Sequence, residues 1–398
     1  MMSVTFQPFL ARSSDYPKVR VATSASLSFK YLKYRASTHN YSAFISNGEF
    51  FIQGRYALIE AMQRANVKKG SIVLLPSFHC RSMVEPALFL GADIYFYQVL
   101  DDLRPDFSRL SSILENKDRR PAVMILTHYF GFPNAVTETK LFCKLRNITL
   151  IEDCAHAIYS QYLGQPLGTS GNYAIASVWK FLPAKDGAFL LDNNKGRSSQ
   201  ICHQSWLREA KSFFVLLQKK AERIFEYMTP LSVNAASLLA EAHKISDKNK
   251  NNLSLESHPG LQNILPDKIQ ISGLRSSFYL TKFSDHARII YQRRKNYQQW
   301  LFGIQSIQEI HPLFSHLPEG VVPYAFPVLA DSQGIIFHML RLAGIPILRW
   351  EDMALSDCPV SSSYRSRLLQ LPCHQDLLPE DIEWMVDTIR QLAMELNQ

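Results

Sequence analysis

Residues 148–187 constrain the fold and chemistry of this chain more than any other stretch, and they read ITLIEDCAHAIYSQYLGQPLGTSGNYAIASVWKFLPAKDG. The apolar run 148–151 predicts a buried strand, and Glu152 and Asp153 follow it directly. A second strand is predicted over 174–179, directly before Lys180. An acid and a lysine at the ends of two central strands can therefore meet on one ligand.

The pair of Asp153 and Lys180 suits an enzyme that uses pyridoxal 5'-phosphate (PLP). In such enzymes a lysine bonds the cofactor and a carboxylate faces the nitrogen of its ring. Taken singly, a lysine is more often a surface residue, and an aspartate at a strand end is more often a helix cap or a turn residue. The hypothesis therefore depends on their combination with the rest of the chain.

Strands and helical patterns alternate at short intervals through the first half of the chain. We expect further strands at 71–76, 93–99 and 122–127, and helices at 82–90, 106–115 and 137–146. This order predicts an α/β fold with a mostly parallel central sheet flanked by helices, in which ligands bind at the carboxyl ends of the strands. Five titratable residues fall just past predicted strands and favour a site at that edge: His79, His128, Asp153, His156 and Lys180.

Gly54 and Arg55 lie at the start of a predicted helix whose apolar face begins after Tyr56. A glycine there lets main-chain N–H groups approach an anion, and the helix dipole favours a phosphate. The other interpretation, which the pattern favours in isolation, is an ordinary glycine turn beside an exposed arginine.

Composition narrows the class of protein. The net charge is +8, which suits anionic ligands or surfaces without choosing among them. Because the basic residues are spread along the chain, we expect no nucleic-acid binding. The six cysteines have no metal-ligand spacing, so we expect free thiols and no metal site. With no apolar stretch of about 18 residues and no signal-peptide pattern, a cytoplasmic protein is expected.

Several stretches together resemble the DegT/DnrJ/StrS family of PLP-dependent sugar aminotransferases, which have the type-I fold of PLP enzymes. The resemblance covers roughly residues 50–192 and 270–398. The most specific part is EDCAHA followed by a lysine 27 positions after its aspartate. The other stretches are GRYALIEAM, KKGSIVLLPSFHC, GADIYFYQV, THYFGFP, WKFLPAKDGAFLL, RRKNY, PYAFPVLA, GIPILRW and LPCHQDLLPEDIEWM.

The resemblance implies roles for three residues in the central stretch. Lys180 matches the lysine that bonds the cofactor, and Asp153 matches the partner of the pyridine nitrogen. His156 stands where the family has Gln or His near the phenolic oxygen of the cofactor. These three residues are the expected catalytic set.

The resemblance also implies a wider cofactor-binding set. Gly54 and Arg55 match the phosphate-binding turn, although Arg replaces a small hydroxyl residue at 55, and Ser177 is a further candidate for contact with the phosphate. Cys80 falls near the aromatic residue that stacks on the ring in the family. Because Cys80 is not aromatic, either His79 would stack on the cofactor ring in its place or the stacking would be weaker.

The function that follows from the resemblance is transfer of an amino group, with glutamate as the expected donor, to a keto-sugar nucleotide. The setting would be cell-surface polysaccharide or secondary-metabolite biosynthesis, and the enzyme would be a homodimer. His128 would either orient the substrate or cap its strand. Alternatives are a dehydratase, a non-sugar aminotransferase, or a decayed PLP-binding protein. The presence of Lys180 favours transamination, since the sugar dehydratases of this group typically lack that lysine.

Three parts of the chain are expected. Residues 1–48 form an irregular arm with one or two short strands. Residues 49–272 form a large PLP-binding domain that includes a variable segment, 193–262. Residues 273–398 form a connector helix over 273–300 and a smaller α+β domain, which closes with an amphipathic helix over 379–396.

Within the variable segment, the polar stretch 243–258 predicts a flexible loop. Residues 201–228 form a long, apolar and basic helical candidate, interrupted by charge too often to span a bilayer. We expect this helix to pack against protein in the core or the dimer interface. The alternative is peripheral contact with an anionic membrane.

Overall fold

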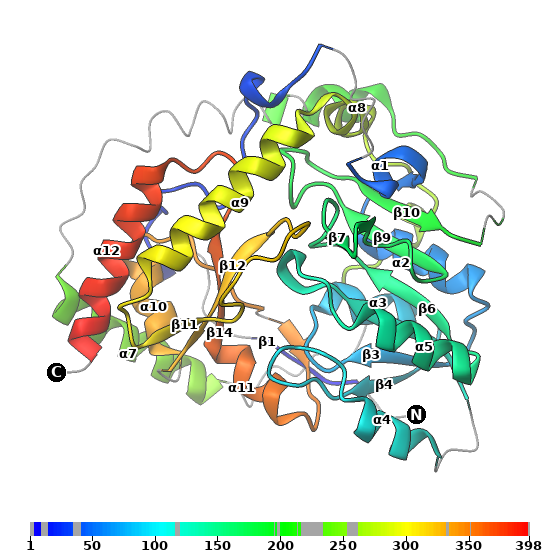
Figure 1. The fold of residues 1–398 in the computed structure, drawn as a ribbon, viewed down its shortest axis with the longest axis horizontal. Coiled ribbons are helices and arrows are strands. Elements are labelled where there is room, and N and C mark those ends of the chain that lie inside the picture. The colour runs from blue at the N-terminus through cyan, green and yellow to red at the C-terminus, as the bar shows by residue number, and fades with distance from the viewer. Residues whose placement is uncertain are drawn as a thin grey trace.

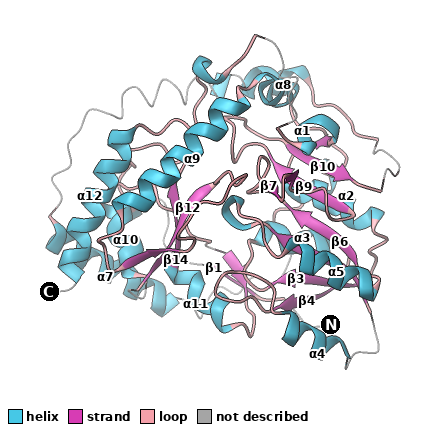
Figure 2. Cartoon of the chain, in the orientation of Figure 1, coloured by secondary structure: helices cyan, strands magenta, loops and turns pink. Residues whose placement is uncertain are grey.

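The computed structural model describes residues 4–8, 15–34, 41–115, 120–194, 196, 200–212, 214–215, 234–252, 262–331, 334–350 and 352–396. Its strands form two main sheets, with helices packed around each (Figure 1 and Figure 2). The architecture is the α/β fold expected from the sequence, with a mostly parallel central sheet.

The large sheet has seven strands, five of which are parallel. From one edge to the other they are β2 (Glu49–Phe51), β10 (Ala188–Asp192), β9 (Tyr173–Ser177), β6 (Thr149–Asp153), β5 (Pro121–Thr127), β3 (Ile72–Pro76) and β4 (Asp93–Tyr97). The five from β9 to β4 run parallel, and β10 and β2 continue the sheet with antiparallel pairing. Chain order reverses between β3 and β5, where a ligand crevice forms in open sheets of this kind.

Helices cover both faces of the large sheet because its central strands are apolar on both sides. On one face, α2 (Gly54–Arg64) and α3 (Arg81–Phe89) share a core with residues of β3, β5 and β6. On the other face, α4 (Phe107–Glu115) and α5 (Val136–Arg146) contribute to a second core. These helices fall where the sequence predicted them, within one or two residues.

The second core continues into the C-terminal part of the chain. There a three-stranded antiparallel sheet forms in the order β11 (Ile310–Pro312), β12 (Ala325–Ala330) and β14 (Leu368–Pro372). The helices beside it are α9 (His286–Gly303), α10 (Ile335–Leu342), α11 (Pro359–Arg367) and α12 (Pro379–Leu396). In the predicted closing helix, α12, the expected apolar stripe of Ile382, Met385, Val386, Ile389 and Leu392 is buried.

The N-terminal arm joins the two parts. Its strand β1 (Phe6–Pro8) pairs with β13 (Asp352–Ala354), and a short 3₁₀ helix, η2, spans Phe29–Tyr31. The hydroxyl of Tyr16 is hydrogen-bonded to Nδ1 of His338 in α10. The main-chain N–H of Ser26 donates a hydrogen bond to the carboxylate of Asp376. The arm therefore rests on the C-terminal part of the molecule and precedes the short helix α1 (Ala43–Asn47).

Three sequence-based expectations about secondary structure were wrong. The polar stretch expected to be a loop from 243 is helical as far as 252, within α7 (Ala235–Asn252), because Ala242 and Ile245 share a buried helix face. The helix packs against α10 and α12. Residues 253–258 of that stretch lie outside the described residues.

The connector expected over 273–300 is two helices, α8 (Arg275–Phe283) and α9, rather than one. The chain is extended at Ser284, and the Asp285 carboxylate accepts a hydrogen bond from the N–H of Arg288, so Asp285 begins a new helix. The strand expected over 174–179 ends at Ser177, so Lys180 lies in the loop that follows β9.

The apolar and basic candidate at 201–228 is only partly described. Residues 206–212 and 214–215 are helical, whereas 213 and 216–228 lie outside the described residues. Trp206, Leu207 and Phe214 are exposed there. Among the described helices, none is long and apolar enough to cross a membrane.

Candidate active site

A cavity of about 390 Å³ opens where the carboxyl ends of β6 and β9 meet the N-terminus of α2 and the start of β12. Six of the residues predicted for the site line it: Gly54, Arg55, Cys80, Asp153, His156 and Lys180. Ser177 lines it as well. The structure therefore brings together seven of the nine predicted residues.

Asp153 is the last residue of β6, and its side chain is 7% exposed. One carboxylate oxygen accepts a hydrogen bond of 2.9 Å from the N–H of Ala155, which fixes the rotation of the group. Burial raises the pKa of Asp153, and the Lys180 ammonium partly opposes that rise. A cation placed against this carboxylate would favour its ionised form.

Lys180 lies three residues past the end of β9, and its ammonium is 5.7 Å from the centre of the Tyr324 ring. Burial lowers the pKa of Lys180, against the opposing effects of Cys80 and Asp153. A lysine with a lowered pKa carries a larger neutral fraction, which is the form that attacks a carbonyl carbon.

His156 is held between two aromatic rings, with Tyr324 stacked 4.4 Å from its centre and Phe130 at 5.8 Å. The N–H of Phe130 donates to Nδ1 of His156 at 3.3 Å, so the proton of the neutral imidazole is on Nε2. Burial lowers the pKa of His156 well below its usual value, and the charge of Lys180 adds to this effect. The ring is thus a neutral hydrogen-bond donor at the cavity.

The N-terminus of α2, which also lines the cavity, offers a place for an anion. Gly54 and Arg55 are the first two residues of α2, where main-chain N–H groups have no acceptor within the helix, whereas the next two N–H groups, of Tyr56 and Ala57, donate to the carbonyl of Gln53. A Cβ at Gly54 would meet only Ile175, at 3.8 Å, so the space before the helix is open. Arg55 donates to the main-chain oxygen of Asn263 at 3.0 Å and lies 4.0 Å from the Glu85 carboxylate.

This arrangement fits PLP. It provides a buried carboxylate for a cationic ring nitrogen, a lysine amine for an aldehyde carbon and a helix N-terminus for a phosphate. The cavity volume lies within the range usual for small-molecule and cofactor sites.

Two predicted residues, His79 and His128, are not among the residues that line the cavity. His79 is fully buried, and its ring stacks on Phe96 at 4.9 Å rather than facing the cavity. Cys80, the next residue, faces the cavity instead, and burial raises the pKa of its thiol.

His128 is also fully buried and makes structural hydrogen bonds. Its Nε2 is 3.0 Å from Glu152, and its Nδ1 accepts a hydrogen bond from the N–H of Asn134. Of the two interpretations left open by the sequence, this geometry favours the strand-end role over contact with a substrate.

Glu152 precedes Asp153 but serves a different purpose, because adjacent strand residues face opposite sides of a sheet. Its carboxylate accepts hydrogen bonds from the N–H groups of Gly168, Ser170 and Gly171. Burial alone would raise the pKa of Glu152, but the hydrogen bond with His128 and those from the main chain lower it overall.

The donor atoms of His128, Glu152 and Cys154 lie within 4.8 Å of one another. All three are buried, and the Glu152 oxygens already accept four hydrogen bonds from protein groups. Hydrogen bonding accounts for this cluster among the described residues, and it does not require a metal ion.

Several cavity residues were not assigned a role from the sequence. Tyr324 and Trp350 add aromatic walls, and Lys185, Arg349 and Asp186 add charge. Asp186 accepts hydrogen bonds from Gln204, Leu274 and Ser277, and burial raises its pKa. Tyr324 and Trp350 lie within the stretches PYAFPVLA and GIPILRW, so the family resemblance located their segments without identifying the residues.

Comparison with known proteins points to one family. Residues 51–194 match the model of the DegT/DnrJ/EryC1/StrS aminotransferase family. GDP-perosamine synthase of Escherichia coli O157:H7 is 25% identical over 174 residues, which are 43% of this chain and 46% of the synthase. A UDP-N-acetyl-3-dehydro-alpha-D-glucosamine 3-aminotransferase of Acidithiobacillus ferrooxidans is 28% identical over 142 residues, which are 36% of this chain and 37% of that enzyme. The matches therefore span less than half of these relatives.

Solved structures match over a longer part of the chain. Helicobacter pylori PseC, described as an aminotransferase of pseudaminic acid biosynthesis, has a TM-score of 0.64 at 13% identity, covering 95% of this chain and all of PseC. The aminotransferase TlmJ of Streptoalloteichus hindustanus has a TM-score of 0.62 at 18% identity, covering 100% of both chains. At these identities the likeness shows that the chain shares its fold with these two aminotransferases.

The burial of His79 predicts a pH effect on stability. Burial lowers its pKa to about 4 from 6.5, and among the described residues its Nε2 has no hydrogen-bond partner. The unfolded chain therefore binds a proton below about pH 6.5 that the folded chain does not bind until about pH 4. The stabilisation is complete above pH 6.5 and is lost as the pH falls, with about 2 kcal/mol lost at pH 5.

The free energy of unfolding in urea, measured at pH 7.5 and pH 5, tests this expectation. Between these two pH values His79→Phe should lose about 2 kcal/mol less of it than the wild type, whereas the exposed His316→Phe should not. Equal losses in all three proteins would contradict this expectation.

Proposed function

We propose that this chain is a PLP-dependent aminotransferase of the DegT/DnrJ/EryC1/StrS family, whose model matches residues 51–194. The expected reaction moves an amino group, with glutamate as donor, to a keto-sugar nucleotide. The observation that carries the proposal is the presence of Asp153 and Lys180 in one cavity, which the N-terminus of α2 also lines.

Two further observations support the substrate class. Matched relatives include enzymes named for GDP- and UDP-linked amino sugars. The cavity is also lined by four cationic side chains, Arg55, Lys180, Lys185 and Arg349, against two carboxylates. That surplus suits a ligand that carries phosphate groups in addition to those of the cofactor. A role in polysaccharide or secondary-metabolite biosynthesis follows from this substrate class.

Bound PLP would supply an electron sink for the bond broken at the amino donor. Asp153 would hold a proton on the ring nitrogen by accepting its hydrogen bond. The first N–H groups of α2, with Arg55 and Ser177, would bind the phosphate. His156 would donate from Nε2 to the phenolic oxygen, because Phe130 occupies its Nδ1.

Lys180 would have two tasks. It would hold the cofactor, and its Nζ would take the proton from Cα of the donor. Its lowered pKa suits both, since a neutral amine is both the nucleophile and the base. Cys80 would lie beside the ring, where its sulfur provides a soft contact in place of an aromatic face.

The first prediction concerns Lys180. Lys180→Ala should abolish transamination and the visible absorption of bound PLP while leaving the circular dichroism of the fold unchanged, because no other residue then supplies the amine at this position. Lys185→Ala, which removes a neighbouring cavity lysine, is the matched control and should keep the visible band. Full activity and an intact band in Lys180→Ala, with loss of both in Lys185→Ala, would transfer the role to Lys185.

The second prediction concerns Asp153. Asp153→Asn should bind PLP more weakly and lower kcat by about 10²-fold or more, because a neutral amide cannot keep the ring nitrogen protonated. Glu152→Gln serves as a comparison: it should weaken the fold through the loop 168–171 before it affects the cofactor. A kcat for Asp153→Asn close to that of the wild type would remove this residue from the cofactor role.

The same assays separate the alternative functions. Release of water from a sugar without uptake of the donor's amine would indicate a dehydratase, and turnover of a keto acid without nucleotide would indicate a non-sugar aminotransferase. Retention of PLP without either reaction would indicate a decayed enzyme. The intact pair of Asp153 and Lys180 argues for an active one.

We also propose a cytoplasmic homodimer, with the exposed side chains of Trp206, Leu207 and Phe214 in its interface or, alternatively, on an anionic membrane surface. Phe214→Glu should raise the monomer fraction in sedimentation if the segment covers a second copy, and should lower vesicle flotation if it binds lipid. Unchanged sedimentation and absence of flotation in both wild type and variant would remove this segment from both roles.

A further inference from the structure

Arg293 is a buried cation that the proposed chemistry does not use. It lies in α9, is 1% exposed, and its guanidinium stacks on the Phe181 ring at 4.5 Å. Buried arginines are normally paired with carboxylates, because removing a charge from water is costly. Here burial lowers the pKa of Arg293, and the partners are of another kind.

All the hydrogen bonds found for this group in the described part of the chain end on neutral oxygens. Its Nε donates to Oε1 of Gln375 at 2.9 Å. Its two terminal nitrogens donate to four main-chain carbonyls, those of Pro323 (3.2 Å), Tyr324 (3.1 Å), Lys180 (3.4 Å) and Phe181 (3.3 Å). The fixed fork of the guanidinium therefore joins two segments that are far apart in the sequence.

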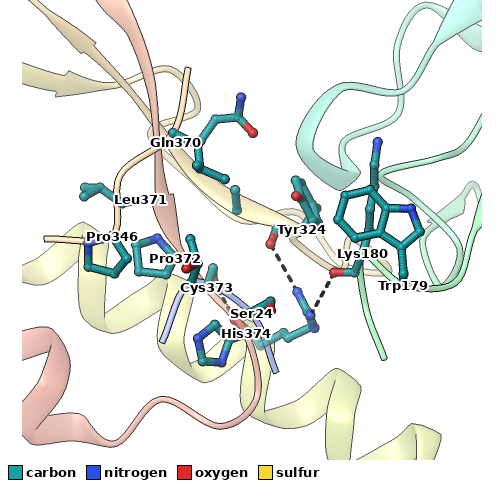
Figure 3. A pocket seen from close by; sticks show the side chains of 14 residues that line it. Ser24, Trp179, Lys180, Tyr324, Pro346, Gln370, Leu371, Pro372, Cys373 and His374 are labelled. Atoms are coloured by element: carbon teal, nitrogen blue, oxygen red, sulfur yellow. Dashed lines mark hydrogen bonds between the residues drawn. The ribbon is translucent and has the colours of Figure 1, made fainter. Parts of the chain in front are cut away.

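One segment carries Lys180 and the other carries Tyr324. Figure 3 shows the side chains of Lys180, Trp179 and Tyr324 close together, with two dashed hydrogen bonds that end on the main chains of Lys180 and Tyr324. Gln375 strengthens the connection, since its Nε2 donates to the carbonyl of Phe181 at 2.9 Å.

The two segments meet again inside the cavity. The Tyr324 ring stacks on His156, and the Lys180 ammonium lies 5.7 Å from the same ring. The place of Lys180 relative to the Tyr324–His156 stack is therefore set by the main-chain positions that Arg293 holds. A carbonyl contact fixes the main chain of Lys180 and leaves its side chain able to move.

We propose that Arg293 is a positioning residue for the proposed reaction: it holds the main chain of Lys180 against that of Tyr324, so that Nζ lies correctly between cofactor and donor. The inference rests on the proposed function. This positioning role requires the shape of an arginine and not only its charge. The five N–H groups of a guanidinium form a planar fork, whereas a lysine ammonium has three N–H groups on a single nitrogen.

The test uses Arg293→Lys in the full-length holoenzyme. This variant keeps the positive charge but cannot reach all five oxygens, so Lys180 and Tyr324 lose their common anchor. We expect kcat to fall by about 10²-fold with little change in KM for the amino donor, because a small misplacement of a reacting group has an effect of that size. The visible circular dichroism of bound PLP, per mole bound, should also change, since it reports the orientation of the cofactor.

Arg294→Lys is the matched control. Arg294 is the next residue of α9, and it donates to the main-chain oxygens of Pro318 and Val321, away from the lysine loop. The same substitution there should lower the melting temperature without changing kcat or the cofactor signal. Gln375→Leu is a milder variant that removes two hydrogen bonds of the anchor and should reproduce part of the Arg293→Lys effect if that protein fails to fold.

The outcomes are distinct. If wild-type protein neither binds PLP nor transaminates, the proposed function fails. If the wild type does both, and Arg293→Lys and Gln375→Leu match Arg294→Lys in kcat and in visible circular dichroism, then Arg293 only stabilises the fold and the positioning role is overturned.

Discussion

The register between the parallel strands β6 and β9 is the constraint on which the rest of the site depends. Asp153 pairs with Ile175, and Lys180 follows five residues later, so both side chains reach the same edge of the sheet. A slip of one residue would exchange the faces of Glu152 and Asp153. Glu152 resists that exchange, because its buried carboxylate is committed to His128 and to the loop at 168–171.

The sequence predicted best what depends on local patterns. The spacing of apolar residues and the position of a glycine indicate where strands end and helices start. These patterns predicted that Asp153 and Lys180 follow strands and that Gly54 lies at the start of a helix. They could not decide between neighbours: His79 and Cys80 were both expected near the cofactor ring, but the loop after β3 turns Cys80 to the cavity and stacks His79 on Phe96. A choice of that kind is made by tertiary packing.

Other features depend on segments distant in the sequence. Tyr324 and Arg293 lie more than a hundred positions from Lys180 in the sequence. No pattern of apolar residues near either position indicates that the carbonyl of Lys180, in the loop after β9, accepts a hydrogen bond from the guanidinium of Arg293 in α9. Likewise, the polar composition of 243–252 predicted a loop, whereas packing against α10 and α12 accompanies a helix with Ala242 and Ile245 on its buried face.

Burial favours the neutral form of three titratable groups that line the cavity, Asp153, His156 and Lys180. Burial raises the pKa of Asp153 and lowers those of Lys180 and His156, so each is biased towards its neutral form. A cationic ring nitrogen against Asp153 would reverse the bias at that carboxylate, whereas His156, already neutral and fixed by Phe130, would keep its Nε2 proton. The protein therefore supplies one group whose charge responds to the ligand and one whose protonation does not. Asp153 is thereby suited to hold a proton on a ring nitrogen, whereas the amine of Lys180, with its lowered pKa, is suited to move another proton at a carbon.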